Sequence, residues 1–121
     1  MGIMGSVVKN CRADQVRFSF RMNDGKKGRE YGCVLTVAGY EDGIIHLVSE
    51  SVGNGIELCQ APYAAEAFLN STTSIGTAKR ILKLKKKDTV KAVRIELKRL
   101  NKPSKCVWVS KDPEMEFSIK A

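Results

Sequence analysis

The sequence lacks the residues that build most metal sites and disulfide frameworks. It contains a single histidine, His46, and its four cysteines are too far apart in the sequence to form any CxxC pair. A zinc finger with the usual His-containing spacing is therefore excluded. Most of the four cysteines (Cys11, Cys33, Cys59 and Cys106) lie in or beside apolar runs, so we interpret them as buried, reduced thiols. We expect neither a metal nor a cofactor.

Long apolar segments are also missing. No segment approaches the roughly 18 apolar residues that suggest a membrane-spanning helix. The first ten residues, MGIMGSVVKN, lack the charged start and the apolar run of a secretory signal. We therefore expect an intracellular protein, in the cytoplasm or the nucleus. With 121 residues, of which 43% are hydrophobic, residues 1–121 are expected to form a single domain with its own core.

No group of residues in the sequence resembles a catalytic site. His46 lies within an apolar run, which is typical of a structural histidine in a strand. Glu41 and Asp42 are adjacent carboxylates, but they belong to a turn sequence. Gly53 and Gly55 do not precede a helix start, as a phosphate-binding loop requires. The sequence therefore predicts a protein that is not an enzyme.

Acidic residues are scarce in one region, and this scarcity is the most informative feature of the chain. Residues 79–105 contain twelve Lys or Arg and two acids, a net charge of +10 against +8 for the whole chain. Residues 40–70 contain five acids and no Lys or Arg. Aliphatic residues run through the basic stretch, which favours a folded, half-buried element over a disordered tail. Such a molecule would present a basic side to polyanions, although a merely solvated charged surface is the alternative.

Hydrophobic alternation predicts a β-rich fold of the α+β class. Residues 16–22 alternate strictly between apolar and polar, and Asn23-Asp24-Gly25 supplies a turn. Further strands are predicted at residues 31–38, 44–48 and 56–59, with short glycine-containing turns between them. The four segments predict an antiparallel meander, forming either an open sheet or a small barrel.

The second half of the chain predicts one short helix and leaves one segment open. Pro62 begins an alanine-rich segment, which predicts a helix near residues 62–70. In the basic stretch, alternation at residues 82–84 and 93–98 predicts two strands. However, Val90, Val93, Leu97 and Leu100 also follow helical spacing, so a second helix at residues 89–100 is the alternative. Strands at 106–110 and 115–119 would complete the sheet.

The basic stretch predicts non-catalytic binding of RNA or DNA, because lysine and arginine contacts to phosphates provide sequence-independent affinity. In the two-strand interpretation, Lys83 and Lys85 would lie beside Arg94 on one surface of the sheet. Trp108 lies between two valines, so burial of the valines would expose the indole for base stacking. Tyr31 and Tyr40 are further candidates for stacking. The predicted contact residues are Lys79, Arg80, Lys83, Lys85, Lys86, Lys87, Lys91, Arg94, Lys98, Arg99 and Trp108.

Two other functions remain open from the sequence. The protein could be a small subunit of an assembly, docking an acidic partner or forming a homo-oligomer through exposed strand edges. It could also be an N-myristoylated peripheral protein, because residues 1–6 match the acceptor pattern with Gly2 at the acylation position. The basic stretch would then supply the second attachment to an anionic membrane.

Overall fold

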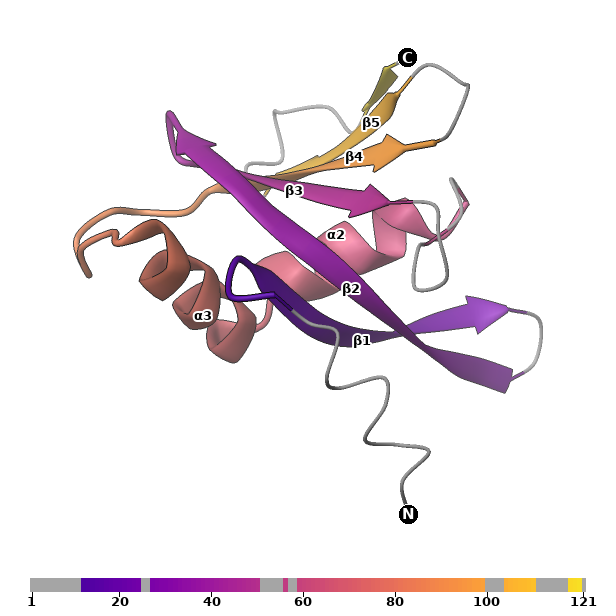
Figure 1. Ribbon diagram of the computed structural model, residues 1–121. Coiled ribbons are helices and arrows are strands. Elements are labelled where there is room, and N and C mark those ends of the chain that lie inside the picture. Colours follow the sequence, from indigo (N-terminus) through magenta and orange to yellow (C-terminus); the bar gives the residue numbers. More distant parts are fainter. Residues whose placement is uncertain are drawn as a thin grey trace.

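A computed structural model of the chain shows a six-stranded sheet and two helices, which confirms the β-rich α+β class (Figure 1). The structure describes residues 12–24, 27–50, 56, 59–99, 104–110 and 118–120. The elements are β1 (Gln15–Asp24), β2 (Lys27–Glu41), β3 (Ile44–Glu50), α2 (Ala61–Leu69), α3 (Thr72–Leu82), β4 (Ala92–Lys98), β5 (Lys105–Ser110) and β6 (Ser118–Lys120).

The six strands follow one another across the sheet in their sequence order. Every neighbouring pair is antiparallel except β3 and β4, which are parallel. Parallel neighbours need a long crossover connection, and α2 and α3 provide it. The predicted meander is thus confirmed for β1 to β3. Among the described residues β1 and β6 do not pair, so the sheet is open rather than a closed barrel.

A tight turn joins β2 to β3. Asp42 and Gly43 both have positive φ angles, of 53° and 82°, as a type I′ hairpin turn requires. Asp-Gly suits this turn because both residues tolerate the left-handed region better than most. Shortly before the turn, the register of β2 against β3 shifts between Val37 and Gly39. This bulge places Gly39 opposite His46.

The core lies between the sheet and the two helices, which pack on the same face of the sheet (Figure 1). Alternate residues of the strands point into it, including Leu35, Leu47 and Ile95, each with no exposed surface. Phe68 of α2 is also fully buried, and its ring lies 5.2 Å from that of Phe18 in β1. Burying one such side chain contributes about 1.5–3 kcal/mol. No described helix covers the opposite face of the sheet.

The predicted helix near residues 62–70 is confirmed as α2, with Pro62 in its first turn. The predicted fourth strand is wrong where it can be compared. Ile56 is buried but lies outside any strand, and its amide donates to Ser49 Oγ at 3.1 Å. Cys59 and Gln60 form a turn that leads directly into α2. Residues 57–58 lie outside the described residues.

The second helix, α3, lies at residues 72–82, where the sequence predicted no helix and a strand was expected to begin at residue 82. Ser71 caps this helix, since its Oγ accepts a hydrogen bond from the amide of Ser74 at 3.1 Å. Ala78 is fully buried, and Ile75 and Leu82 pack against the core at helical spacing. The alternation at residues 82–84 therefore did not indicate a strand.

The open question about residues 89–100 is resolved by β4, which spans Ala92–Lys98, and the helix alternative is wrong. Hydrogen bonding to β3 on one side and β5 on the other outweighs the local helical spacing. The strand predicted at 106–110 is confirmed as β5. Of the strand predicted at 115–119, residues 118 and 119 lie in β6 and the others lie outside the described residues. Neither described helix has the length and the apolar sequence needed to cross a bilayer.

Candidate nucleic-acid interface

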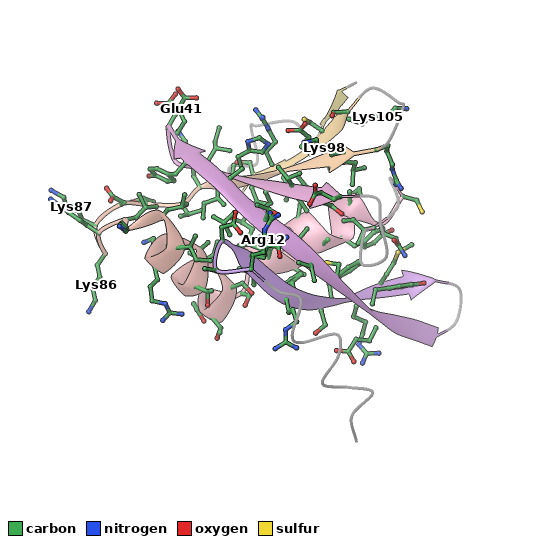
Figure 2. The ribbon with its side chains drawn as sticks, in the orientation of Figure 1. Arg12, Glu41, Lys86, Lys87, Lys98 and Lys105 are labelled. Carbon is green, nitrogen blue, oxygen red and sulfur yellow. The ribbon has the colours of Figure 1, made fainter. Side chains whose placement is uncertain are left out.

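The predicted basic residues do not form one continuous patch. Lys79 to Lys91 precede β4, Arg94 lies in the middle of it, and Lys98 and Arg99 lie at its end. A strand of this length spans about 20 Å at roughly 3.3 Å per residue. Figure 2 shows Lys86 and Lys87 projecting from one end of the molecule, with Lys98 and Lys105 at the other. The predicted sheet surface with Lys83 and Lys85 beside Arg94 is therefore wrong.

The densest group of charges lies on the segment between α3 and β4, residues 83–91, which we call the basic loop. Lys83, Lys85, Lys86 and Lys87 are all exposed. The ion pairs among the described residues, Arg12–Asp14 and His46–Glu96, involve none of these four. Lys79 and Arg80 in the last turn of α3 extend the same surface.

The backbone of the basic loop is fixed by its own hydrogen bonds. The amide of Lys85 donates to Asp88 Oδ2 at 2.8 Å, and the amide of Asp88 donates to the Lys85 carbonyl at 3.0 Å. Lys79 Nζ reaches from α3 to the carbonyl of Lys86 at 3.3 Å. The only acid in the basic loop is therefore used to shape it, and the loop's lysine side chains point outward.

Two further bonds attach the basic loop to the sheet. Tyr40 of β2 donates its hydroxyl to the carbonyl of Thr89 at 2.8 Å. The amide of Lys91 donates to the carbonyl of Gly43 at 2.8 Å. The Lys91 stem also covers Gly43, because a Cβ there would lie 2.9 Å from Lys91 Cγ. Lys91 is exposed, but its stem has a structural role.

The basic loop begins with a residue in an unfavourable conformation. Lys83 has φ 59° and ψ 39°, in the left-handed region where glycine is usual after a helix. The amide of Lys83 donates to the carbonyl of Arg80 at 3.2 Å, and that of Leu84 to the carbonyl of Lys79 at 2.9 Å. These two bonds supply donors to carbonyl groups in the last turn of α3. The left-handed conformation of Lys83 then directs the chain away from the helix axis. A lysine in this conformation costs about 1 kcal/mol or more.

Arg94 belongs to a three-residue network on the uncovered face of the sheet. His46 Nε2 lies 3.1 Å from Glu96 Oε1, and Arg94 Nη2 lies 3.3 Å from His46 Nδ1 and 3.1 Å from Nε2. The Glu96 carboxylate can only accept, so it pairs with His46 when Nε2 carries a proton, and the Arg94 guanidinium lies against both ring nitrogens. Burial and the Arg94 charge lower the pKa of His46, and Glu96 partly opposes them. Arg94 is thus half-buried in this network and does not project like the loop lysines.

Arg99 also has a structural contact. Its Nη2 donates to the carbonyl of Ile56 at 2.9 Å, which ties the end of β4 to the segment before α2. Lys98 is exposed at the end of β4, near Lys105 at the start of β5. These residues form a second basic group, smaller than the basic loop and separated from it by the length of β4.

Two of the three aromatic candidates for stacking, Tyr31 and Tyr40, already make contacts within the protein. Tyr31 is half-buried, and its ring stacks on that of Phe20 with centroids 5.7 Å apart. The hydroxyl of Tyr40 donates a hydrogen bond to the backbone carbonyl of Thr89. Trp108 lies in β5, with its backbone in register with Arg94 of β4, but its side chain lies outside what the structure describes. Stacking by Trp108 stays a prediction.

Sequence reasoning missed a pocket of about 330 Å³ on the uncovered face of the sheet. The sequence placed Gly39 in a turn after the strand predicted at residues 31–38, but the structure places it within β2, where a glycine often marks a bulge or a close approach. The pocket brings together residues of β2, β3 and β4 that are far apart in the sequence. Its lining residues are Gly39, Tyr40, Glu41, Ile44, His46 and Arg94.

The cysteines are more varied than predicted. Cys33 is buried, and burial raises the pKa of its thiol to about 12. Cys106 is half-buried, but Cys59 is exposed because it lies in the turn before α2, so the prediction of a buried thiol is wrong there. Cys11 lies outside the described residues. Within the described ranges, no three His, Cys, Asp or Glu residues are grouped so that they could hold a metal ion.

Comparison with known proteins identifies no relative of this chain. No protein-family model matches the chain, and no curated protein and no solved structure matches it significantly.

Proposed function

We propose that this protein binds RNA or DNA without catalysis and that the basic loop makes the main phosphate contacts. One observation carries the proposal. Four exposed lysines, Lys83, Lys85, Lys86 and Lys87, lie within five residues on a loop whose backbone is held by α3, Asp88 and Tyr40. Such a surface concentrates positive charge without an ion-paired carboxylate among the described residues to neutralise it.

The fixed backbone matters for affinity. Each lysine that neutralises a phosphate releases condensed counterions, which is the main source of sequence-independent binding. A loop that is already ordered loses little backbone entropy on binding, so more of this free energy remains as affinity. Lys79 and Arg80 would extend the contact along the end of α3.

The composition of the basic loop favours a polyanion over an acidic protein partner. Protein interfaces are depleted in lysine and need an apolar centre that excludes water. The loop instead presents its lysines outward, while Leu84 and Val90 are half-buried and buried, respectively. A phosphate backbone needs only point charges at suitable spacing.

A salt titration with two matched double variants tests the proposal. Lys86→Gln/Lys87→Gln removes two exposed charges from the basic loop, and Lys98→Gln/Lys105→Gln removes two from the other end (Figure 2). Fluorescence anisotropy would follow binding to labelled single strands and duplexes of RNA and DNA from low to physiological salt. We expect the loop variant to lower affinity for all sequences alike. It should also flatten the slope of log K against log salt by about 1.4 for single strands.

The control variant should change this slope by less than half as much. If both variants changed the slope equally, the charges would act through the net field and not through the basic loop. If the wild-type protein bound none of the four nucleic acids at physiological salt, the proposed function would be wrong.

A further inference from the structure

We infer that the pocket at Gly39 and Arg94 receives one unstacked nucleobase of a single strand whose phosphates lie along the basic loop. This inference rests on the proposed function and adds a preference for single-stranded RNA or DNA. Bases become available to such a pocket only where they are not paired in a duplex. The pocket would therefore supply a contact that duplexes cannot make.

The pocket and the basic loop adjoin one another. Tyr40 lines the pocket and also donates its hydroxyl to Thr89 in the loop. Ile44 lines the pocket and follows Gly43, whose carbonyl accepts from Lys91 at the end of the loop. Figure 2 shows Glu41, another lining residue, at the same end of the molecule as Lys86 and Lys87. A strand bound along the loop lysines would thus pass the mouth of the pocket.

The size and the walls of the pocket suit a flat ring. Its volume of about 330 Å³ lies at the lower end of the range for small-molecule sites, about 300–1,000 Å³. At Gly39, no atom lies within 4 Å of the place that a Cβ would occupy, so the strand backbone is open to close approach. Ile44 provides an apolar wall.

The polar groups of the pocket are planar or accept hydrogen bonds. The guanidinium of Arg94 and the imidazole of His46 are planar groups of the kind on which bases stack. The contact of 3.1–3.3 Å between them and the His46–Glu96 bond hold this pair in place before any ligand arrives. Glu41 adds a carboxylate, which can accept from the N–H groups on the edge of a base.

A pair of glycine variants distinguishes binding in the pocket from binding elsewhere on the surface. Gly39→Val would place a side chain in the open space of the pocket. Gly32→Val is the matched control, because Gly32 lies in the same strand and does not line the pocket. A Cβ added at Gly32 would likewise have no atom within 4 Å. Neither glycine has a positive φ, and valine suits a strand.

Each variant would be titrated with two labelled single strands of equal length, one of them lacking the bases in its central part. Both strands carry the same phosphates, so the comparison isolates the bases. We expect wild type and Gly32→Val to bind the intact strand about tenfold more tightly than the base-depleted one. Gly39→Val should bind both strands equally, with the affinity that wild type shows for the base-depleted strand.

The outcomes distinguish this inference from the proposed function. If wild type discriminated between the strands and Gly39→Val did so equally well, the bases would be bound elsewhere and the inference would fail alone. If wild type bound neither strand, both would fail. Should Gly39→Val not fold, 2-aminopurine placed at successive positions of the strand would report on the wild type. A change in emission at one position on binding is expected, and no change at any position would overturn the inference.

Discussion

The hydroxyl of Tyr40 donates a 2.8 Å hydrogen bond to the backbone carbonyl of Thr89, 49 residues further along the chain. This bond joins the end of β2, where it approaches its hairpin, to the loop that carries most of the lysines that are exposed among the described residues. The amide of Lys91 makes a second bond to the same hairpin at Gly43. The position of the basic loop is thus set by the hairpin and not only by the loop's own sequence.

Removal of the Tyr40 hydroxyl should loosen the basic loop. We expect Tyr40→Phe to lower the free energy of unfolding by about 1 kcal/mol, the usual net value of one hydrogen bond. Amide exchange at residues 84–91 should become faster, and urea unfolding with hydrogen-exchange mass spectrometry would measure both effects. Tyr63→Phe is the control, since Tyr63 on α2 is 42% exposed. Equal stability of the two variants would contradict the role of the Tyr40–Thr89 bond.

Replacement of Lys83 by glycine should stabilise the fold. Lys83 has a φ of 59°, which glycine adopts without strain. We therefore expect Lys83→Gly to raise the free energy of unfolding by about 1 kcal/mol. Lys86→Gly removes the same charge at a position without positive φ. It should lower the free energy of unfolding by about 0.5–1 kcal/mol, because glycine increases the conformational entropy of the unfolded chain. Urea midpoints of the two variants would therefore move in opposite directions. A loss of stability in Lys83→Gly would show that its conformation is not strained.

The elements that local sequence determines were predictable. Alternation located β1, and apolar runs between turn residues located much of β2 and β3. Asp42-Gly43 marked the turn between β2 and β3, and Pro62 marked the start of α2. Helix α3 was missed because Gly76 and its threonines have low helix propensity. Its stability comes from the Ser71 cap and from packing against the core, neither of which appears as a period in the sequence.

The site was predictable in charge but not in shape. The density of lysine in residues 79–105 predicted a basic surface, and the basic loop provides one. The basic loop is separated from Lys98 by the length of β4, and this segment is a strand because it pairs with β3 and β5. The pocket depends on the pairing of β4 with β3, because it brings Arg94 beside His46. Local patterns contain no information on which distant strands become neighbours.

The three described cysteines should differ in reactivity toward a thiol reagent. Cys59 is exposed and should be labelled first, whereas Cys33 is buried with a pKa of about 12 and so has almost no thiolate at neutral pH. We expect Cys33 to be labelled only as fast as the protein unfolds. Timed labelling with peptide mass spectrometry would identify each site, with labelling in urea as the control. Rapid native labelling of Cys33 would contradict its burial in the core.

The contacts of His46 predict how stability depends on pH. Burial and the Arg94 charge lower its pKa from 6.5 in the folded state, while Glu96 raises it by less. Between the folded pKa and 6.5, the unfolded chain therefore binds more protons than the folded chain does. The stability that His46 contributes is fully present above pH 6.5 and is lost as the pH falls from 6.5 to the folded pKa. Because the chain has one histidine, its NMR signal gives this pKa without ambiguity.

Two charge-removing variants should shift this pKa in opposite directions. Arg94→Gln removes a positive charge beside His46 and should raise the pKa toward 6.5, whereas Glu96→Gln removes the opposing carboxylate and should lower it further. NMR titration of the imidazole proton would measure each value. On acidification, the loss of stability should begin near pH 6.5 in both variants, because the unfolded pKa is unchanged. It should end at a higher pH in Arg94→Gln than in wild type, and the total loss should be smaller. If neither substitution changed the His46 pKa, burial alone, and not the two neighbouring charges, would set its proton affinity.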